Sequence, residues 1–237
     1  MTDRRKMERT KVLGLSVDPL RVEKALFLTS HYLEAHKFEY ITFVNTQAAL
    51  VGQSDQEFAD FISQAALVLP GDNNIEEAVE LSRWIEQGTS YQAEYFRRFL
   101  TRLNRQRGAA YLMMEKEEEL LLLKKIFAEK YEKIRLETIL WQSDSSVDSM
   151  VNDINILAPE MLLICGDYGH IRSFLNEHGN KINTGLCFCM DTIMTDEEKE
   201  YPAWVKEYHM QGLYDNLYKK PIKWVQDMIF RKRMKKH

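Results

Sequence analysis

Residues able to do chemistry gather in five short polar segments, each of which follows an apolar run. The segments are 45–47, 70–74, 114–115, 166–170 and 191–195. They carry carboxylates, amides and a histidine, the groups that exchange protons or hydrogen-bond a polar ligand. We therefore expect these five segments to form the functional site.

The apolar runs before these segments have the length of β-strands. They cover residues 12–17, 40–45, 66–70, 109–114, 137–141, 161–166 and 185–190. Their apolar character is continuous rather than alternating, which is typical of parallel strands covered on both faces. Charged segments with helical periodicity lie between them, over residues 21–36, 55–64, 75–86, 93–106, 117–133 and 147–156.

This alternation predicts a Rossmann-like, doubly wound α/β fold with helices on both faces of the sheet. We expect a mainly parallel sheet of about six or seven strands, followed by a C-terminal helical appendage. The predicted domain boundaries are 1–200 for the α/β domain and 201–237 for the appendage. Ligands of such sheets bind beyond the carboxyl ends of the strands, which is where the five polar segments fall.

Composition limits the classes of function. The chain has 237 residues, 45% of them apolar, which is enough for one large α/β domain. Its three cysteines, Cys165, Cys187 and Cys189, form no CxxC pair and lie in apolar runs, so we expect buried thiols in a reducing compartment and no metal site. The polar N-terminal segment and the lack of any run long enough to span a membrane predict a cytoplasmic protein.

Four longer segments, taken in order, share the pattern of one known family. They are KVLGLSVDPLRVEKAL, YITFVNTQAALVGQSDQEFADFISQAALVLP, INILAPEMLLICG and YPAWVKEYHMQGLYDNLYKKPIKW. They resemble the first strand and helix, the second strand through the strand ending in Leu-Pro, a later strand, and the C-terminal appendage of the WecG/TagA/CpsF glycosyltransferases. The resemblance spans roughly residues 11 to 228, nearly the whole chain.

The resemblance implies transfer of an N-acetylhexosamine, typically N-acetylmannosamine, from a UDP-sugar donor. The implied acceptor is a polyprenyl-diphosphate-linked sugar at the inner membrane face. The family's reaction inverts the anomeric centre and is thought to need no metal or other cofactor. It makes an early linkage in cell-surface polysaccharides such as teichoic acid, enterobacterial common antigen or capsule.

Two aspartates are the catalytic candidates that the resemblance implies. An inverting transfer needs a carboxylate to take the proton of the acceptor. The family carries Asp-Gly directly after Leu-Pro, whereas this chain has Gly71 and then Asp72. Asp72 is therefore either a base on a loop of altered register or the N-cap of the following helix. Asp191 stays in its expected place after the last strand, where it contacts the sugar, acts as base, or caps the next segment of the chain.

Substrate binding is implied for Asn45, Gln47, Asn73, Gly166 and His170 of these segments, and for Arg172 shortly after the fourth. Asn45 either hydrogen-bonds the sugar or uridine, or closes the strand-to-helix turn. Arg172 stands with Ser173 where the family carries Gln-Glu, and it either neutralises a diphosphate or is an ordinary exposed arginine. His170 is either an acid/base group or a solvated loop histidine.

Several of the family's polar loop positions have changed in this chain while its apolar framework is kept. That pattern is expected when a fold is retained and its chemistry is redirected or lost. The alternative function is therefore a catalytically silent relative that acts as partner or scaffold of an active glycosyltransferase at the membrane. A homo- or hetero-oligomer is compatible with either function.

The C-terminal segment is strongly basic. From residue 219 onward it holds eight Lys and Arg against one acid, Asp227, so the tail carries +7 and the remainder −11 of a net −4. A helix over 221–234 places Trp224 on an apolar face, with basic residues including Arg231, Lys232 and Arg233 mostly elsewhere. This suits peripheral binding to an anionic membrane surface, and the alternative is a helix docked on the body. The acidic body carries no nucleic-acid module, so we expect no nucleic-acid partner.

Overall fold

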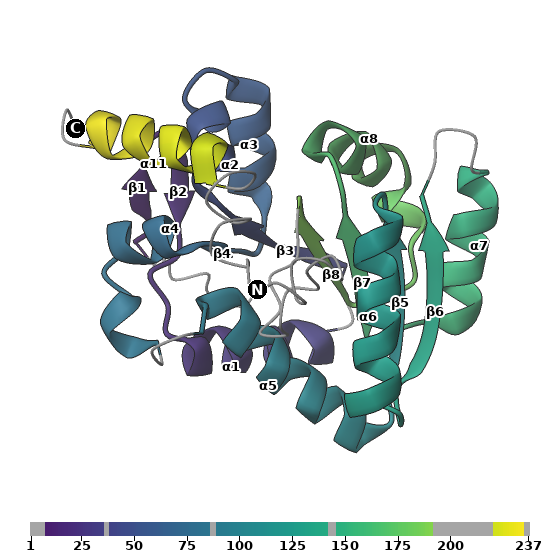
Figure 1. Ribbon diagram of the computed structural model, residues 1–237. Coiled ribbons are helices and arrows are strands. Elements are labelled where there is room, and N and C mark those ends of the chain that lie inside the picture. Colours follow the sequence, from purple (N-terminus) through teal and green to yellow (C-terminus); the bar gives the residue numbers. More distant parts are fainter. Residues whose placement is uncertain (1–7, 36–37, 86–88, 142–145, 192–219, 235–237) are drawn as a thin grey trace, which may run out of the picture.

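The computed structural model describes residues 8–35, 38–85, 89–141, 146–191 and 220–234, the last of these segments with its side chains from residue 227 onward. Six strands form one parallel sheet in the order β4-β3-β8-β7-β5-β6 (Figure 1). Their bounds are β3 Glu39–Val44, β4 Leu67–Pro70, β5 Ala109–Met114, β6 Arg135–Leu140, β7 Met161–Cys165 and β8 Leu186–Met190. The predicted parallel α/β sheet is confirmed.

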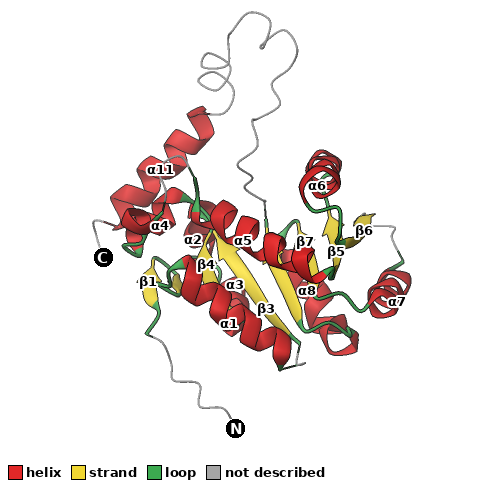
Figure 2. Ribbon diagram, turned by 90° about the horizontal axis from the view of Figure 1, so that it is seen from below, coloured by secondary structure: helices red, strands yellow, loops and turns green. Residues whose placement is uncertain are grey.

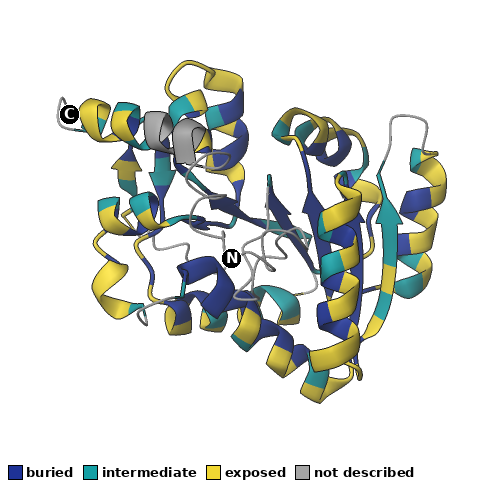
Figure 3. Ribbon diagram, viewed as in Figure 1, coloured by how far each residue is buried: buried dark blue, intermediate teal, exposed yellow. Residues whose placement is uncertain are grey.

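The inner strands are buried on both faces, as their continuous apolar sequence predicts (Figure 3). Successive side chains of β3 point to opposite sides of the sheet. Tyr40 stacks on Phe61 on one side, at a ring distance of 5.3 Å. On the other side Phe43 packs against Tyr95 and Phe96, at 5.3 and 5.2 Å. The sheet is therefore the middle layer of three.

Helices cover both faces of this sheet. In Figure 2, α6 (Glu117–Lys130) lies on one side of the strands, and α7 (Val147–Leu157) and α8 (Tyr168–His178) lie on the other. The remaining helices of the body are α1 Val22–Glu34, α2 Thr46–Gly52, α3 Gln56–Gln64, α4 Asn73–Ala78 and α5 Tyr91–Gln106, with short 3-10 turns at Ser82–Trp84 and Gly179–Lys181. Ring contacts place α3 and α5 on opposite faces, because Phe61 belongs to α3 and Phe96 to α5.

The prediction that residues 12–17 form a strand of the main sheet is wrong. They belong to a separate antiparallel hairpin of β1 (Thr10–Val12) and β2 (Leu15–Val17). The turn between these strands includes Gly14, where a Cβ atom would lie 2.0 Å from the carbonyl oxygen of Gly52. This close approach to the end of α2 requires glycine at position 14.

The helix predicted over 75–86 is also too long. It is divided into α4 and a 3-10 turn, and Glu80 between them has a φ of 59°. A left-handed residue inside an α-helix interrupts its hydrogen-bond ladder, so the helix ends before it. The other predicted helices end within a few residues of their predicted bounds.

The C-terminal helix α11 (Lys220–Met234) contacts α2. Phe230 of α11 is only 3% exposed and joins the core of the body. Asp227 accepts a hydrogen bond from Asn74 at the start of α4 (2.7 Å). The described part of this helix is therefore docked on the α/β body, while the predicted boundary at 200 falls in a segment outside the described residues.

Candidate functional site

The carboxyl ends of the strands lie level with one another. In neighbouring strands Cys165 pairs with both Met114 and Met190, and Met114 also pairs with Leu140. The residues that follow these positions are Glu115, Gly166, Asp191 and Trp141. They therefore share one edge of the sheet, as the sequence predicts for its polar segments.

Asn45 and Asp191 are brought together at this edge. The Asn45 side-chain amide donates to Oδ2 of Asp191 over 2.8 Å. Its carbonyl oxygen accepts from the backbone N–H of Ala48 over 2.9 Å and so caps α2. The two side-chain groups of Asn45 thus close the strand-to-helix turn and hold the carboxylate of Asp191 in position.

Asp72 is held by the backbone of two helix starts. Its Oδ1 accepts from the N–H of Ile75 (3.0 Å), which makes Asp72 the N-cap of α4. Its Oδ2 accepts from the N–H of Thr46 (2.7 Å), the first residue of α2. Each oxygen therefore has a structural partner, and the carboxylate ties the loops after β3 and β4 to each other.

A pocket of about 350 Å³ opens beside Asp191, between α2, α3 and α8. Its lining includes three of the sequence-predicted residues, Gln47, Arg172 and Asp191. The other lining residues are Ala48, Val51, Asp55, Phe58, Asp167, Tyr168 and Gly169. A wider groove of about 450 Å³ continues from it between α3 and α8, and the two share Gly169 and Arg172. The pocket has the size of a small-ligand site and combines polar groups with apolar walls.

Sequence reasoning missed most of this apolar and acidic lining. Asp55 accepts from the N–H of Phe58 (2.9 Å) and Asp167 from that of Gly169 (2.8 Å), so they cap α3 and α8. A cap signature, an aspartate before an apolar helix, predicts such a position along the chain. The starts of α3 and α8 meet at one pocket because of the order of the strands. A cap signature carries no information about strand order.

Among the described residues that line the pocket, Arg172 supplies positive charge and three aspartates supply negative charge. Arg172 lies 3.2 Å from the carboxylate of Glu57, whose side chain is 84% exposed. Exposed ion pairs of this kind contribute at most about 1 kcal/mol. An anionic ligand can therefore replace Glu57 at Arg172 at little cost.

His170 and Gly166 lie on the other side of the first turn of α8. His170 Nδ1 is 2.7 Å from Glu115 Oε1, and Glu115 Oε2 accepts from the N–H of Asp167 (2.8 Å). The hydrogen bond to Glu115, and then its negative charge, raise the pKa of His170 above its usual value. A Cβ atom on Gly166 would lie within 2.6 Å of the Glu115 carboxylate, so glycine makes room for this contact.

A second polar pair, Lys116 and Glu119, lies near the carboxyl end of β7. Lys116 Nζ contacts Glu119 Oε1 at 2.9 Å, and the thiol of Cys165 donates to Glu119 Oε2 at 3.3 Å. The hydrogen bond that Lys116 donates to Glu119 raises the pKa of Lys116, and the charge of Asp191 contributes to the same shift. Lys116 is therefore a cation on the α6 side of Asp191 that sequence reasoning did not single out.

Four further predicted site residues, Asn73, Arg231, Lys232 and Arg233, lie outside the pocket. Asn73 is exposed as the first residue of α4 and does not line the pocket. Arg231, Lys232 and Arg233 are exposed on α11, and the Arg233 guanidinium donates to Gln53 (2.5 Å). The side chain of Trp224 lies outside the described residues.

The described residues can be compared with the requirements of a metal site and of a membrane-spanning helix. Within those residues no group of three or more His, Cys, Asp or Glu is arranged to hold a metal ion. In the same part of the chain, no helix combines the length and apolar composition needed to cross a bilayer.

Comparison with known proteins agrees with the geometry. The model of one family, described as the glycosyl transferase WecG/TagA/CpsF family, matches residues 10–232. No curated protein matches the chain. The family match covers nearly the whole chain and confirms the resemblance seen in the sequence.

Proposed function

This chain belongs to the WecG/TagA/CpsF family of glycosyltransferases, and on that premise we propose that it transfers an N-acetylhexosamine from a UDP-sugar to a polyprenyl-diphosphate-linked acceptor. The observation that carries this proposal is the pocket beside Asp191, which joins Gln47, Arg172 and Asp191 at the carboxyl edge of the sheet. Open α/β sheets bind their ligands at this edge.

Arg172 and Gln47 are the proposed donor-binding residues. The Arg172 guanidinium is suited to the diphosphate of the UDP-sugar, because it forms paired hydrogen bonds with phosphate oxygens and its ion pair with the exposed Glu57 is weak. Gln47 lies in the first turn of α2 and faces the same pocket. Asn45 acts indirectly, by positioning Asp191.

Asp191 is the proposed base. The acceptor hydroxyl oxygen attacks the anomeric carbon of the donor sugar from the face opposite the diphosphate. The bond between that carbon and the UDP oxygen breaks, UDP leaves with the bonding electrons, and the hydroxyl proton passes to the Asp191 carboxylate. Asp72 is less suited to this role because both of its oxygens already accept backbone hydrogen bonds.

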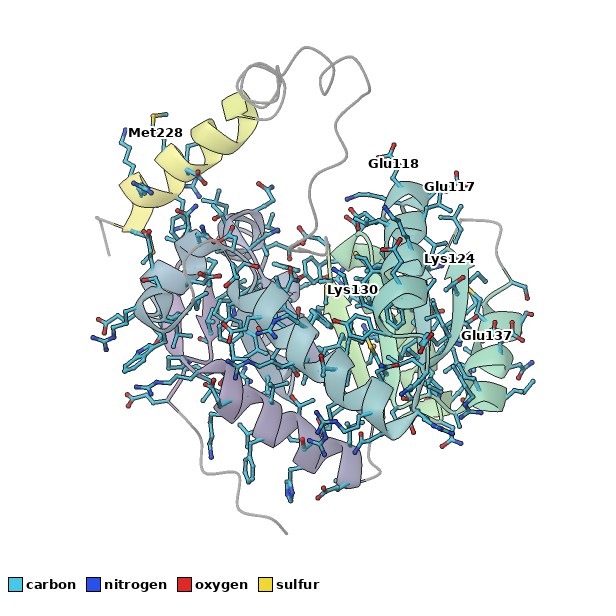
Figure 4. All side chains as sticks on the ribbon, turned by 60° about the horizontal axis from the view of Figure 1, so that its bottom comes forward. Glu117, Glu118, Lys124, Lys130, Glu137 and Met228 are labelled. Atoms are coloured by element: carbon cyan, nitrogen blue, oxygen red, sulfur yellow. The ribbon has the colours of Figure 1, made fainter. Side chains whose placement is uncertain are left out.

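We place this reaction at the cytoplasmic face of a membrane, where a polyprenyl-linked acceptor would be found. Exposed Arg231 and Lys232 on the docked helix α11 offer positive charge to anionic lipid headgroups. Met228 is 49% exposed and points away from the body on the same helix (Figure 4). An exposed apolar residue beside basic ones is typical of peripheral membrane contact.

A second candidate is a silent relative that acts as partner or scaffold of an active transferase. It is favoured by the charge of the pocket, where three aspartates stand against Arg172 among the described lining residues. A diphosphate gains less in such surroundings than in a site with several cations. Retained binding without turnover, or co-purification with another glycosyltransferase, would support this function.

The decisive variants are Asp191→Asn and Asp72→Asn, assayed with a UDP-N-acetylhexosamine and a polyprenyl-diphosphate-linked acceptor. Loss of a general base lowers turnover by about 10²–10⁴-fold, and we expect this for Asp191→Asn with the melting temperature retained. Asp72→Asn should mainly lower stability, because the changed side chain caps α4 and holds Thr46. Equal turnover of Asp191→Asn and the unaltered chain would exclude Asp191 as base.

A further inference from the structure

A tryptophan, a histidine and a carboxylate meet at the carboxyl end of β5, β6 and β7, outside the donor pocket. Trp141 directly follows β6, and its backbone N–H donates to the carbonyl of Met114 (2.7 Å). Its ring contacts the ring of His170 at 6.2 Å and that of Phe174 at 5.6 Å. Glu115 holds His170 through a 2.7 Å contact to Nδ1. These three residues are therefore fixed relative to one another.

This cluster lies at the point where the chain changes direction in the sheet. The connection after β5 runs through α6 to β6, toward one edge. The connection after β7 runs through α8 to β8, toward the other edge. Because β5 and β7 are neighbours, the chain leaves them in opposite directions, and ligands usually bind at such a point in these folds.

The chemistry of the cluster matches a hexose. Trp141 is half-buried, and an indole is suited to pack against the apolar C–H face of a sugar ring. The His170 side chain is 69% exposed, and the Glu115 carboxylate beside it orients the imidazole. An oriented imidazole and a carboxylate next to an aromatic ring are suited to hydrogen-bonding sugar hydroxyls.

The first turn of α8 separates this cluster from the donor pocket. Gly169 and Arg172 are three residues apart and face α3, where they line the pocket. His170 and Phe174 are four residues apart and face Trp141. Asp191 and Gly166 occupy neighbouring positions at the carboxyl edge of the sheet, and Gly166 lies just before this helix turn. A transferase binds donor and acceptor on two sides of the reacting groups. The pocket and the Trp141 cluster lie on two sides of this helix turn.

We propose that Trp141, His170 and Glu115 form a subsite for the sugar of the acceptor. The proposal rests on the proposed transferase function, because it assigns the second substrate of that reaction. Trp141 packs on the sugar ring, and His170 and Glu115 bind its hydroxyls. None of the three is assigned to bind the donor.

The subsite can be tested through the Trp141 indole N–H, observed by NMR while N-acetylglucosamine 1-phosphate, UDP or UDP-N-acetylglucosamine is added. We expect the sugar phosphate to shift this signal and UDP alone to leave it in place. Trp141→Leu should weaken binding of the sugar phosphate by about two- to tenfold, with Trp141→Phe restoring part of the loss. The matched control is Trp84→Leu, which removes an exposed tryptophan stacked on Arg21 and should change nothing.

If Trp141→Leu does not fold, His170→Ala serves instead, because the His170 side chain is largely exposed and its removal leaves no cavity. Unchanged binding of the sugar phosphate in either folded variant would overturn the subsite, as would a Trp141 signal that responds only to the UDP-sugar. Sugar-phosphate binding without any binding of UDP-sugars would contradict the transferase function and leave this subsite in place.

Discussion

Three aspartates near the pocket, Asp55, Asp72 and Asp167, each accept hydrogen bonds from the N–H groups of a helix start. Such caps each contribute about 1 kcal/mol and place a carboxylate at the carboxyl edge without any ligand. Asp191 is held by the side-chain amide of Asn45, over 2.8 Å. At the residue scale, these caps give the three aspartates a structural role, and the Asn45 amide positions the catalytic candidate Asp191.

The His170 and Glu115 contact predicts a measurable titration. The pKa of His170 should lie above the ordinary value of about 6.5, and Glu115→Gln should bring it down toward that value. The stabilisation from this pair is present below the unfolded pKa and is lost as pH rises through the folded one. NMR titration of the imidazole in both proteins checks the direction, and equal pKa values would contradict the assigned contact.

The sequence predicts the positions of these residues better than their partners. Asn45, Asp72 and Asp191 are predicted at strand ends, and they are found there. The sequence leaves Asp72 as either a base or a helix N-cap. The structure favours the cap, because the N–H groups of Thr46 and Ile75 donate to its carboxylate. Thr46 lies 26 residues away along the chain, so this contact arises from the pairing of β3 with β4, which no local pattern encodes.

At the scale of elements, apolar runs identify all six strands of the parallel sheet, and the pattern is strongest for the inner strands, which are buried on both faces. It also wrongly assigns the hairpin β1–β2 to that sheet, since a short reversal at Gly14 leaves the apolar run unbroken. The helix before residue 86 is predicted too long because the left-handed Glu80 has no distinctive sequence signal. Predictions fail where the backbone bends inside a segment whose polarity does not change, even where a single glycine such as Gly14 lies at the bend.

The contribution of Phe230 to the docking of α11 can be tested. Phe230→Ala removes a side chain that is 3% exposed, and such truncations cost about 3–5 kcal/mol in a core. We expect the amides of residues 227–234 to exchange hydrogen much faster, while those of the central strands stay protected. Met228→Ala is the control, because that side chain is 49% exposed. Unchanged protection in Phe230→Ala would mean that other contacts hold the helix.

On the scale of the whole molecule, charge is unevenly distributed. The sequence from 219 onward carries +7 and the remainder −11. The aspartates that line the pocket, Asp55, Asp167 and Asp191, belong to the acidic part of the sequence. The exposed Arg231 and Lys232 belong to the basic helix α11. An anionic surface therefore attracts the α11 side of the protein and repels much of the rest, which favours one orientation.

Membrane binding should depend on these charges. Replacing Arg231 and Lys232 by alanine should weaken binding to phosphatidylglycerol vesicles by about 2 kcal/mol, or roughly 30-fold. The matched control replaces Lys124 and Lys130 on α6, which changes the net charge equally at exposed positions elsewhere (Figure 4). Vesicle sedimentation at low and high salt measures both. Equal losses for the two double variants would indicate that net charge alone, and not α11, controls binding.

The donor pocket is tested most directly by the melting temperature with and without millimolar UDP, UDP-N-acetylglucosamine and UDP-N-acetylmannosamine. Ligand at about a hundred times its dissociation constant stabilises the folded state by roughly 2.7 kcal/mol. For a chain of this size that corresponds to a rise of about 5–10 °C, and Arg172→Ala should reduce it. No rise with any uridine nucleotide would contradict a donor pocket beside Asp191 and leave the silent partner as the function of this chain.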